Sequence, residues 1–159
     1  MFAKTHDDVR RIYDSVDTVK RLSDRIIGIG PINIIGLDGI LAWFPGVAPV
    51  YSVLAGGFIL LQGARARCDL VTLVAAFIVL AMDSGISLFD GLVPVIPAGS
   101  ILDTFFQGHL YAAHMIQKDI EKTHYVEGSA SQAHRDGSHQ ENLGEMRSTK
   151  GKKRIVYLG

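Results

Sequence analysis

The chain has 159 residues, of which 48% are apolar, and its 16 basic side chains balance its 16 acidic ones. This length fits one domain, and a formal net charge of zero argues against a partner held by bulk charge, such as a nucleic acid. The one cysteine, Cys68, excludes an internal disulfide and a multi-cysteine metal site.

The charges are unevenly distributed along the chain. Only seven of them fall between residues 26 and 116, and the two flanking segments hold the rest. We therefore divide the chain into an amphipathic segment at 1–25, an apolar domain at 26–120 and a polar tail at 121–159. Acids begin at Asp7, so the N-terminus lacks the pattern of a cleavable signal peptide, and internal apolar segments are expected to direct any insertion.

Residues 5–25 are predicted to form an amphipathic helix. Its apolar side chains recur at three- and four-residue steps, which is the spacing of one helical face. These residues are Val9, Ile12, Val16, Val19, Leu22 and Ile26. The other face mixes acids with bases, whereas lipid-seeking helices are rich in bases. We expect the apolar stripe to pack on protein, with a membrane surface as the alternative.

A short phrase occurs twice in the apolar domain, 52 positions apart. In each copy a carboxylate opens a run of large apolar residues, and a proline then breaks the run. An interior proline loses a helical hydrogen bond and clashes with the preceding turn. The repeat therefore predicts two helical hairpins, each folded at a proline turn. Its residues are Asp38, Gly39, Pro45 and Gly46 in the first copy, and Asp90, Gly91 and Pro97 in the second.

Both hairpins are apolar enough to suit a membrane. Between Asp38 and Arg65 there are 26 consecutive uncharged residues, and the run from Leu70 to Met82 carries no charge. A helix needs about 20 apolar residues to cross a bilayer. We predict an all-α fold of membrane-embedded helical hairpins, two tandem proline-turn repeats that either span the bilayer or re-enter it. A soluble helical bundle is the alternative.

The basic residues predict an orientation. Six precede Ile26, two lie in the loop at Arg65 and Arg67, eight follow Ile116, and none lies near either proline turn. Cytoplasmic loops carry an excess of Lys and Arg. Both termini and the middle loop are therefore expected on the cytoplasmic side.

A final helix is predicted from about Ser100 to Lys118, with a polar stripe through Tyr111 and His114 and an apolar side that holds His109. Beyond this helix the chain turns polar, and such a segment buries too little apolar surface to offset its ordering entropy. We expect a disordered or partner-bound tail. Its candidates for contact with anionic lipid or a partner are Lys150, Lys152, Lys153, Arg154 and Tyr157.

The repeated phrase resembles a known family. It is similar to the Leu-Asp, aliphatic run and Pro-Gly-Val-Gly-Asp element that occurs twice in a bacterial membrane family, domain of unknown function 4112. The matching residues are Leu37, Asp38, Pro45, Gly46 and Val47, then Phe89, Asp90, Pro97, Gly99 and Asp103. The chain departs from the element at Ala48, Pro49 and Ser100. The resemblance covers about residues 26–116 and implies a bacterial inner membrane, with no activity to transfer.

Acids within apolar helices are the candidates for chemistry, because an intramembrane carboxylate is costly and is functional by default. Asp38 and Asp90 hold equivalent repeat positions and are interpreted as structural residues. This leaves Asp83, Asp103 and His109 as candidate functional polar residues. The sequence has no phosphate loop, nucleophile elbow or zinc motif, so we predict no enzyme, no cofactor and no metal.

The expected role is that of a small integral membrane protein, a structural or accessory subunit of a larger membrane complex. Its hairpins, its amphipathic helix and its tail offer surfaces to the lipid bilayer, to other membrane subunits or to a second copy. The alternative is an oligomeric transporter or channel that moves protons or ions through intramembrane Asp residues.

Overall fold

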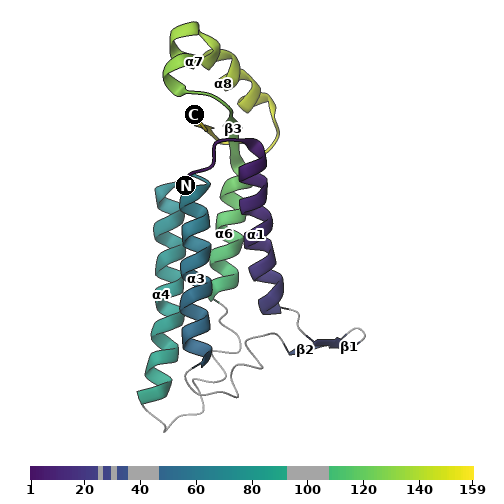
Figure 1. The fold of residues 1–159 in the computed structure, drawn as a ribbon, viewed down its shortest axis with the longest axis vertical. Helices are drawn as coiled ribbons and strands as arrows, with labels where there is room; N and C mark the ends of the chain where they lie inside the picture. The colour runs from purple at the N-terminus through teal and green to yellow at the C-terminus, as the bar shows by residue number, and fades with distance from the viewer. Residues whose placement is uncertain (25–26, 30–31, 36–46, 93–107) are drawn as a thin grey trace.

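The computed structural model describes residues 1–24, 27–29, 32–35, 47–92 and 108–159, and for residues 83–92 it describes the helix path alone. Four long helices run side by side in an elongated bundle (Figure 1): α1 (His6–Asp24), α3 (Val47–Arg65), α4 (Leu70–Leu92) and α6 (Gly108–Lys122). α1 packs on α3 and α6, and α4 packs on the same two helices. α1 and α4 therefore flank the α3–α6 pair from opposite sides.

The polar cap, residues 123–159, lies at the end of the bundle that holds both chain termini (Figure 1). It consists of β3 (Thr123–Val126), α7 (Ala130–Asp136), α8 (Ser138–Ser148) and β4 (Arg154–Tyr157). β3 and β4 pair in parallel, with Thr123 opposite Arg154 and Val126 opposite Tyr157. Parallel strands need a long crossover connection, which α7 and α8 supply.

The polar cap corrects the prediction of a disordered tail. Leu158 is fully buried and Tyr125 is 8% exposed, and both belong to the same hydrophobic core cluster as the bundle. The tail has too few apolar residues to fold around a core of its own. The bundle supplies the missing apolar surface, so a few well-placed side chains are enough to order the segment.

The mostly helical fold is confirmed, but the described part of the chain also holds short strands. β1 (Ile27–Ile29) and β2 (Ile32–Ile35) form an antiparallel pair near the end of α1. Both strands fall within the domain 26–120, which was predicted to be all-α, so the prediction is wrong for residues 27–29 and 32–35. Three of the four residues of β2 are isoleucines, whose branched side chains favour extended backbone.

α1 forms as predicted and packs on protein. Val9, Ile12 and Val16 are 6%, 4% and 0% exposed. The helix begins with a reciprocal cap, in which the Asp8 backbone N–H donates to Thr5 Oγ1 at 3.1 Å and the Thr5 N–H donates to Asp8 Oδ2 at 3.3 Å. The part of the apolar stripe formed by Val9, Ile12 and Val16 is thus covered by α3 and α6.

α6 also shows the two predicted faces over its described length. His109, Ala112 and Ile116 are buried, whereas Tyr111 and His114 are exposed. The sequence period was therefore sufficient to orient this helix.

Among the described residues, no helix combines the length and the apolar character that crossing a membrane requires.

Candidate functional site

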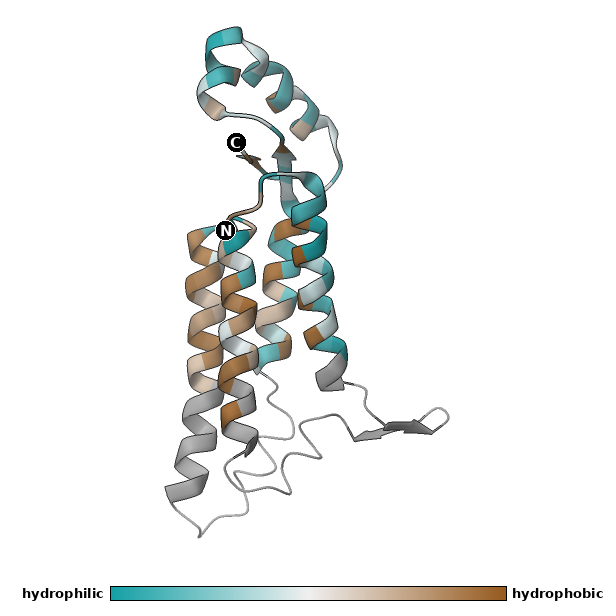
Figure 2. Ribbon diagram, in the orientation of Figure 1, coloured by the Kyte–Doolittle hydropathy of each residue, from teal (hydrophilic) through white to brown (hydrophobic). Residues whose placement is uncertain are grey.

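An apolar surface lies on α3 and α4, the two helices whose described residues are coloured mostly as hydrophobic in Figure 2. Its large side chains are between 37% and 74% exposed. We call this set the apolar face: Val50, Val53, Leu54, Phe58 and Leu61 on α3, and Leu70, Val71, Val74, Phe77, Ile78 and Met82 on α4. Soluble monomers rarely expose an apolar patch this large, and such patches mark contact with protein or lipid.

The apolar face ends where the polar cap begins. The one charged residue of α3 is Arg65, its last residue, and α4 carries no charge from Leu70 to Met82. Arg67 and Asp69 lie in the loop between these helices, on the side of the cap. The boundary between apolar and polar surface therefore coincides with the α3–α4 loop.

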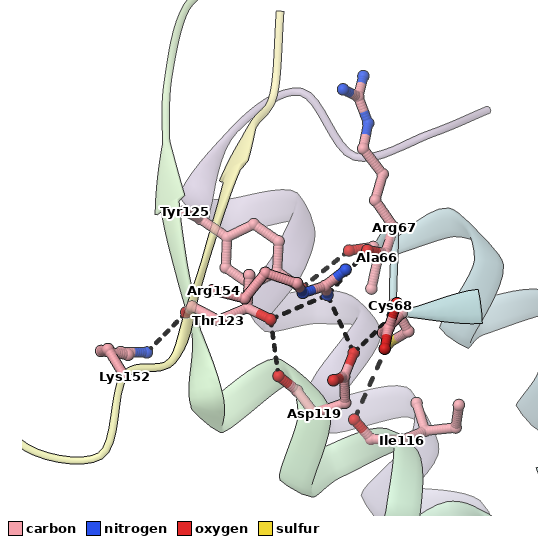
Figure 3. Close-up of polar contacts among 10 residues, drawn as sticks. Ala66, Arg67, Cys68, Ile116, Asp119, Thr123, Tyr125, Lys152 and Arg154 are labelled. Carbon is pink, nitrogen blue, oxygen red and sulfur yellow. Dashed lines mark hydrogen bonds and ion pairs between the residues drawn. The ribbon is translucent and has the colours of Figure 1, made fainter. Parts of the chain in front are cut away.

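A polar junction joins this loop to the cap (Figure 3). The Asp119 carboxylate accepts hydrogen bonds from Arg154 Nη2 at 3.0 Å and from the Asp69 backbone N–H at 2.9 Å. Arg154 Nη2 also lies 3.0 Å from the Arg67 carbonyl oxygen and 3.0 Å from Thr123 Oγ1. One guanidinium thus holds together α6, β3 and the loop.

Further contacts fasten the loop from the cap side. Arg67 points its guanidinium away from Asp119 (Figure 3) and donates to the carbonyl oxygens of Tyr157 and Leu158 at 2.5 and 3.3 Å. Tyr125 donates its hydroxyl to the Ala66 carbonyl at 2.8 Å. Arg67 has a φ of 55°, a conformation uncommon for a residue with a side chain. These bonds keep the loop in that conformation.

Cys68 lies inside the junction and is 7% exposed. Its Sγ is 4.0 Å from the Ile116 carbonyl oxygen. Burial, with the nearby Asp119 carboxylate, raises the pKa of the thiol well above its ordinary value. Because the thiolate is the reactive form, this cysteine is a structural residue rather than a nucleophile.

Polar ties also join α1 to the other helices. Tyr13 donates its hydroxyl to Glu121 Oε1 at 2.6 Å, and this hydrogen bond raises the pKa of Tyr13 to about 12. Gln117 Nε2 donates to Asp17 at 3.2 Å. Such bonds between helices fix the register of α1 against α6.

The structure describes only some of the predicted site residues. His109 is 3% exposed on α6, and Asp83, Asp90 and Gly91 lie on the neighbouring helix α4, where their positions are known by helix path alone. The other predicted residues lie outside the described residues: Asp38, Gly39, Pro45, Gly46, Pro97 and Asp103. In the described part, no three side chains of metal-binding type gather.

The basic cluster of the tail divides into two groups. Arg154 is held in the junction, and Lys152 Nζ donates to the Thr123 carbonyl at 2.8 Å. The Tyr157 hydroxyl lies 2.9 Å from His139 Nδ1. Lys150 and Lys153 are exposed and stay candidates for contact with lipid or a partner.

Two partners of Arg154 in the junction, Asp119 and Thr123, were not predicted as site residues. Asp119 and Thr123 are one helical turn apart, and Thr123 Oγ1 donates to the Asp119 carbonyl at 2.8 Å. Their spacing of four residues is that of two residues on one side of a helix, and this could have been recognised from the sequence. Their link to Arg154, more than 30 residues later, had no local signal.

Comparison with known proteins shows the family to which the chain belongs. Residues 12–120 match the sequence model of a family described as Domain of unknown function (DUF4112). The chain belongs to this family. The resemblance seen in the repeated phrase is thereby confirmed. No curated protein and no solved structure matches the chain. The DUF4112 match ends near the end of α6, so the polar cap lies outside it.

Proposed function

We propose that this DUF4112 protein is a membrane-embedded structural or accessory subunit that contacts lipid through its apolar face. The observation that carries the proposal is the exposure of eleven large apolar side chains on two adjacent helices. In water this arrangement is unfavourable by about 25 cal/mol per Å² of apolar surface. Hydrocarbon removes that cost.

The dimensions of the hairpin support contact with a bilayer. α3 has 19 residues and α4 has 23. At a rise of 1.5 Å per residue they are about 28 and 35 Å long, but the last ten residues of α4 include Asp83 and Asp90. The proposal therefore rests on contact of the uncharged part of the two helices with hydrocarbon, not on a complete span. The charged loop and the polar cap lie together at one end, which suits the headgroup region. The bias of Lys and Arg toward this end favours the cytoplasmic side of a bacterial inner membrane.

The α1 side of the bundle, opposite α4, limits how the protein can be placed in a membrane. α1 lies away from α4, and its outer face carries acids and bases such as Arg10, Asp14 and Arg21. A charged helix face does not contact hydrocarbon at tolerable cost. The α1 side therefore faces water or the polar surface of another subunit. This two-sided character supports an accessory subunit better than an isolated span.

A membrane extraction experiment tests the proposal. We expect the full chain to stay in the membrane pellet after a carbonate wash. The variant Leu54→Glu/Phe77→Glu places two charges on the apolar face and is expected to leave the pellet or fail to accumulate. The control Gln132→Glu/Gln140→Glu adds the same charge to exposed positions on α7 and α8 and should behave as wild type.

A wild-type protein that is soluble without detergent, as a monomer or as a dimer that buries the apolar face, would overturn the membrane proposal. An apolar-face variant that stays as membrane-bound as wild type would overturn the role of the face itself.

The accessory role has its own test. After mild detergent extraction we expect a defined set of membrane subunits to co-purify with the protein, and a lone monomer would contradict this role. Reconstituted protein is expected to carry no proton or ion flux. A flux that both Asp38→Asn and Asp90→Asn abolish would favour a transporter instead.

A further inference from the structure

A cationic cleft lies beside the apolar face, between the N-terminal segment, α1 and the last turn of α3. Its volume is about 220 Å³, which is below the range of sites for whole cofactors and suits a small polar group. Lys4, Arg11 and Arg65 line it, against one carboxylate, Asp8. Three cationic side chains around a small opening are typical of an anion site.

The one carboxylate of the cleft, Asp8, accepts hydrogen bonds from the backbone. Asp8 Oδ2 accepts the N–H groups of Lys4 and Thr5 at 3.0 and 3.3 Å. Those bonds hold the pKa of Asp8 below its ordinary value, so the carboxylate stays ionised and directed at the start of α1. Asp8 also interacts electrostatically with Arg11, so it offsets one of the three cations and leaves the cleft with an excess of positive charge.

Arg65 is oriented toward the cleft by its neighbours. Its Nε donates to the Met1 carbonyl at 3.0 Å, and its Nη1 donates to Gln62 Oε1 at 3.0 Å. Gln62 is 5% exposed and donates in turn to Ser15 Oγ at 3.0 Å. These bonds use two of the five N–H groups of the guanidinium and pre-orient the rest.

A stripe of the apolar face leads directly to Arg65. Val50, Leu54, Phe58 and Leu61 are separated by steps of four, four and three residues, and Arg65 follows four residues later. Residues at these steps lie on one side of a helix. The first four are 58%, 67%, 37% and 58% exposed. An acyl chain lying along this stripe would bring its headgroup to the cleft.

We propose that this cleft binds the phosphate of an anionic phospholipid headgroup whose acyl chains lie along the Val50–Leu61 stripe. The inference rests on the proposed membrane contact of the apolar face. Exposed apolar side chains also border the cleft on its N-terminal side, where Met1 and Phe2 are 88% and 60% exposed. The combination of cations with adjacent apolar side chains is that of a headgroup site rather than of a site for a free anion.

Lipid binding to the full chain in neutral detergent tests this site. Native mass spectrometry would follow titration with dioleoyl phosphatidylglycerol and, separately, with dioleoyl phosphatidylcholine. Wild type is expected to prefer phosphatidylglycerol. The variant Lys4→Gln/Arg11→Gln removes two exposed cations and spares Arg65, and it should bind phosphatidylglycerol about thirtyfold more weakly.

Matched controls separate the site from bulk charge and from folding. Arg10→Gln/Lys118→Gln removes the same charge from exposed positions outside the cleft and should leave the affinity unchanged. Equal losses in the two double variants, or no lipid preference in wild type, would overturn the proposal. Circular dichroism should show the same helix content in both variants, and an affinity loss accompanied by unfolding in the cleft variant alone would also count against it.

Two further arms distinguish the ligand source and the underlying function. Glycerol phosphate at millimolar concentration should not displace the lipid, and displacement that depends on Lys4 and Arg11 would assign the cleft to a free phosphate compound instead. The cleft variant should stay in the carbonate-washed membrane pellet. Loss of the wild type from that pellet would defeat the proposed function, whereas loss of lipid preference alone would defeat only this site.

Discussion

Asp119 and Arg154 show how one residue pair ties the polar cap to the bundle. The pair is 3.0 Å apart, with side chains 14% and 30% exposed. A second ion pair, Arg21 with Asp17, is shorter at 2.6 Å, but its arginine is 76% exposed. Solvent screens an exposed pair, so the shorter distance does not make it the stronger contact. Burial and the number of partners decide the energy.

We predict that Arg154→Gln lowers the free energy of unfolding by about 2 kcal/mol, between the values for exposed and for buried pairs. The substitution leaves the Asp119 carboxylate without its cation and the Arg67 carbonyl without its donor. Arg21→Gln is the matched control and should cost about 0.5 kcal/mol or less. Thermal unfolding followed by circular dichroism measures both, and equal losses would contradict the argument.

At the scale of elements, glycine spacing decides how closely α3 meets its neighbours. A Cβ added to Gly63 would lie 2.5 Å from Ile116 Cδ1 and 3.0 Å from Leu73 Cδ2. Ile116 is fully buried, so it has no room to move. A Cβ added to Gly57 would meet nothing within 4 Å. Two glycines six residues apart on one helix therefore serve different purposes.

We predict that Gly63→Ala destabilises the bundle by about 1 to 3 kcal/mol, because the added methyl overpacks the contact of α3 with α6. Gly57→Ala should instead stabilise it by up to about 1 kcal/mol through the higher helix propensity of alanine. Denaturation of both variants under one set of conditions measures the difference. Equal stability of the two variants would show that α6 moves to admit the methyl.

The sequence predicted those elements whose signal is local. The faces of α1 and α6 follow from apolar spacing near 3.6 residues. The pairing of β3 with β4 was not predictable, because it joins Thr123 to Arg154 across a polar segment without a period. The roles of Gly63 and Asp119 were not predictable either, because they depend on which distant segment of the chain packs against each residue. The repeat at Asp38 and Asp90 keeps its structural interpretation as a prediction.

For the whole molecule, the distribution of surface chemistry is the main result. In the described part of the chain, the bundle exposes charged residues on α1 and apolar residues on α3 and α4. The polar cap closes one end of the bundle (Figure 2). The cap lies outside the DUF4112 match, yet it covers the loop between the two apolar helices. Arg67 and Leu158 make this contact from the two sides. The cap is therefore expected to control access to that loop.

Cys68 is the one cysteine of the chain, so its rate of chemical labelling can measure how well the polar cap covers the α3–α4 loop. It shares the hydrophobic core cluster with Leu158 and Tyr125. We predict that maleimide labels the native protein far more slowly than the urea-unfolded chain, since the thiol is buried and its pKa is raised. Leu158→Ala should speed native labelling by about thirtyfold or more. Leu143→Ala, at a half-exposed position of α8, should change it by about twofold at most.

The pH dependence of labelling distinguishes opening of the cap from direct attack on the closed protein. A rise of pH toward the ordinary thiol pKa of 9.0 increases the thiolate fraction of the unfolded chain. The folded pKa lies higher, so the native thiol stays protonated over the same range. Stability linked to Cys68 is therefore fully present below pH 9 and is lost as the pH rises toward the folded pKa.

If Leu158→Ala leaves the native labelling rate unchanged, reagent reaches Cys68 by a route other than the cap.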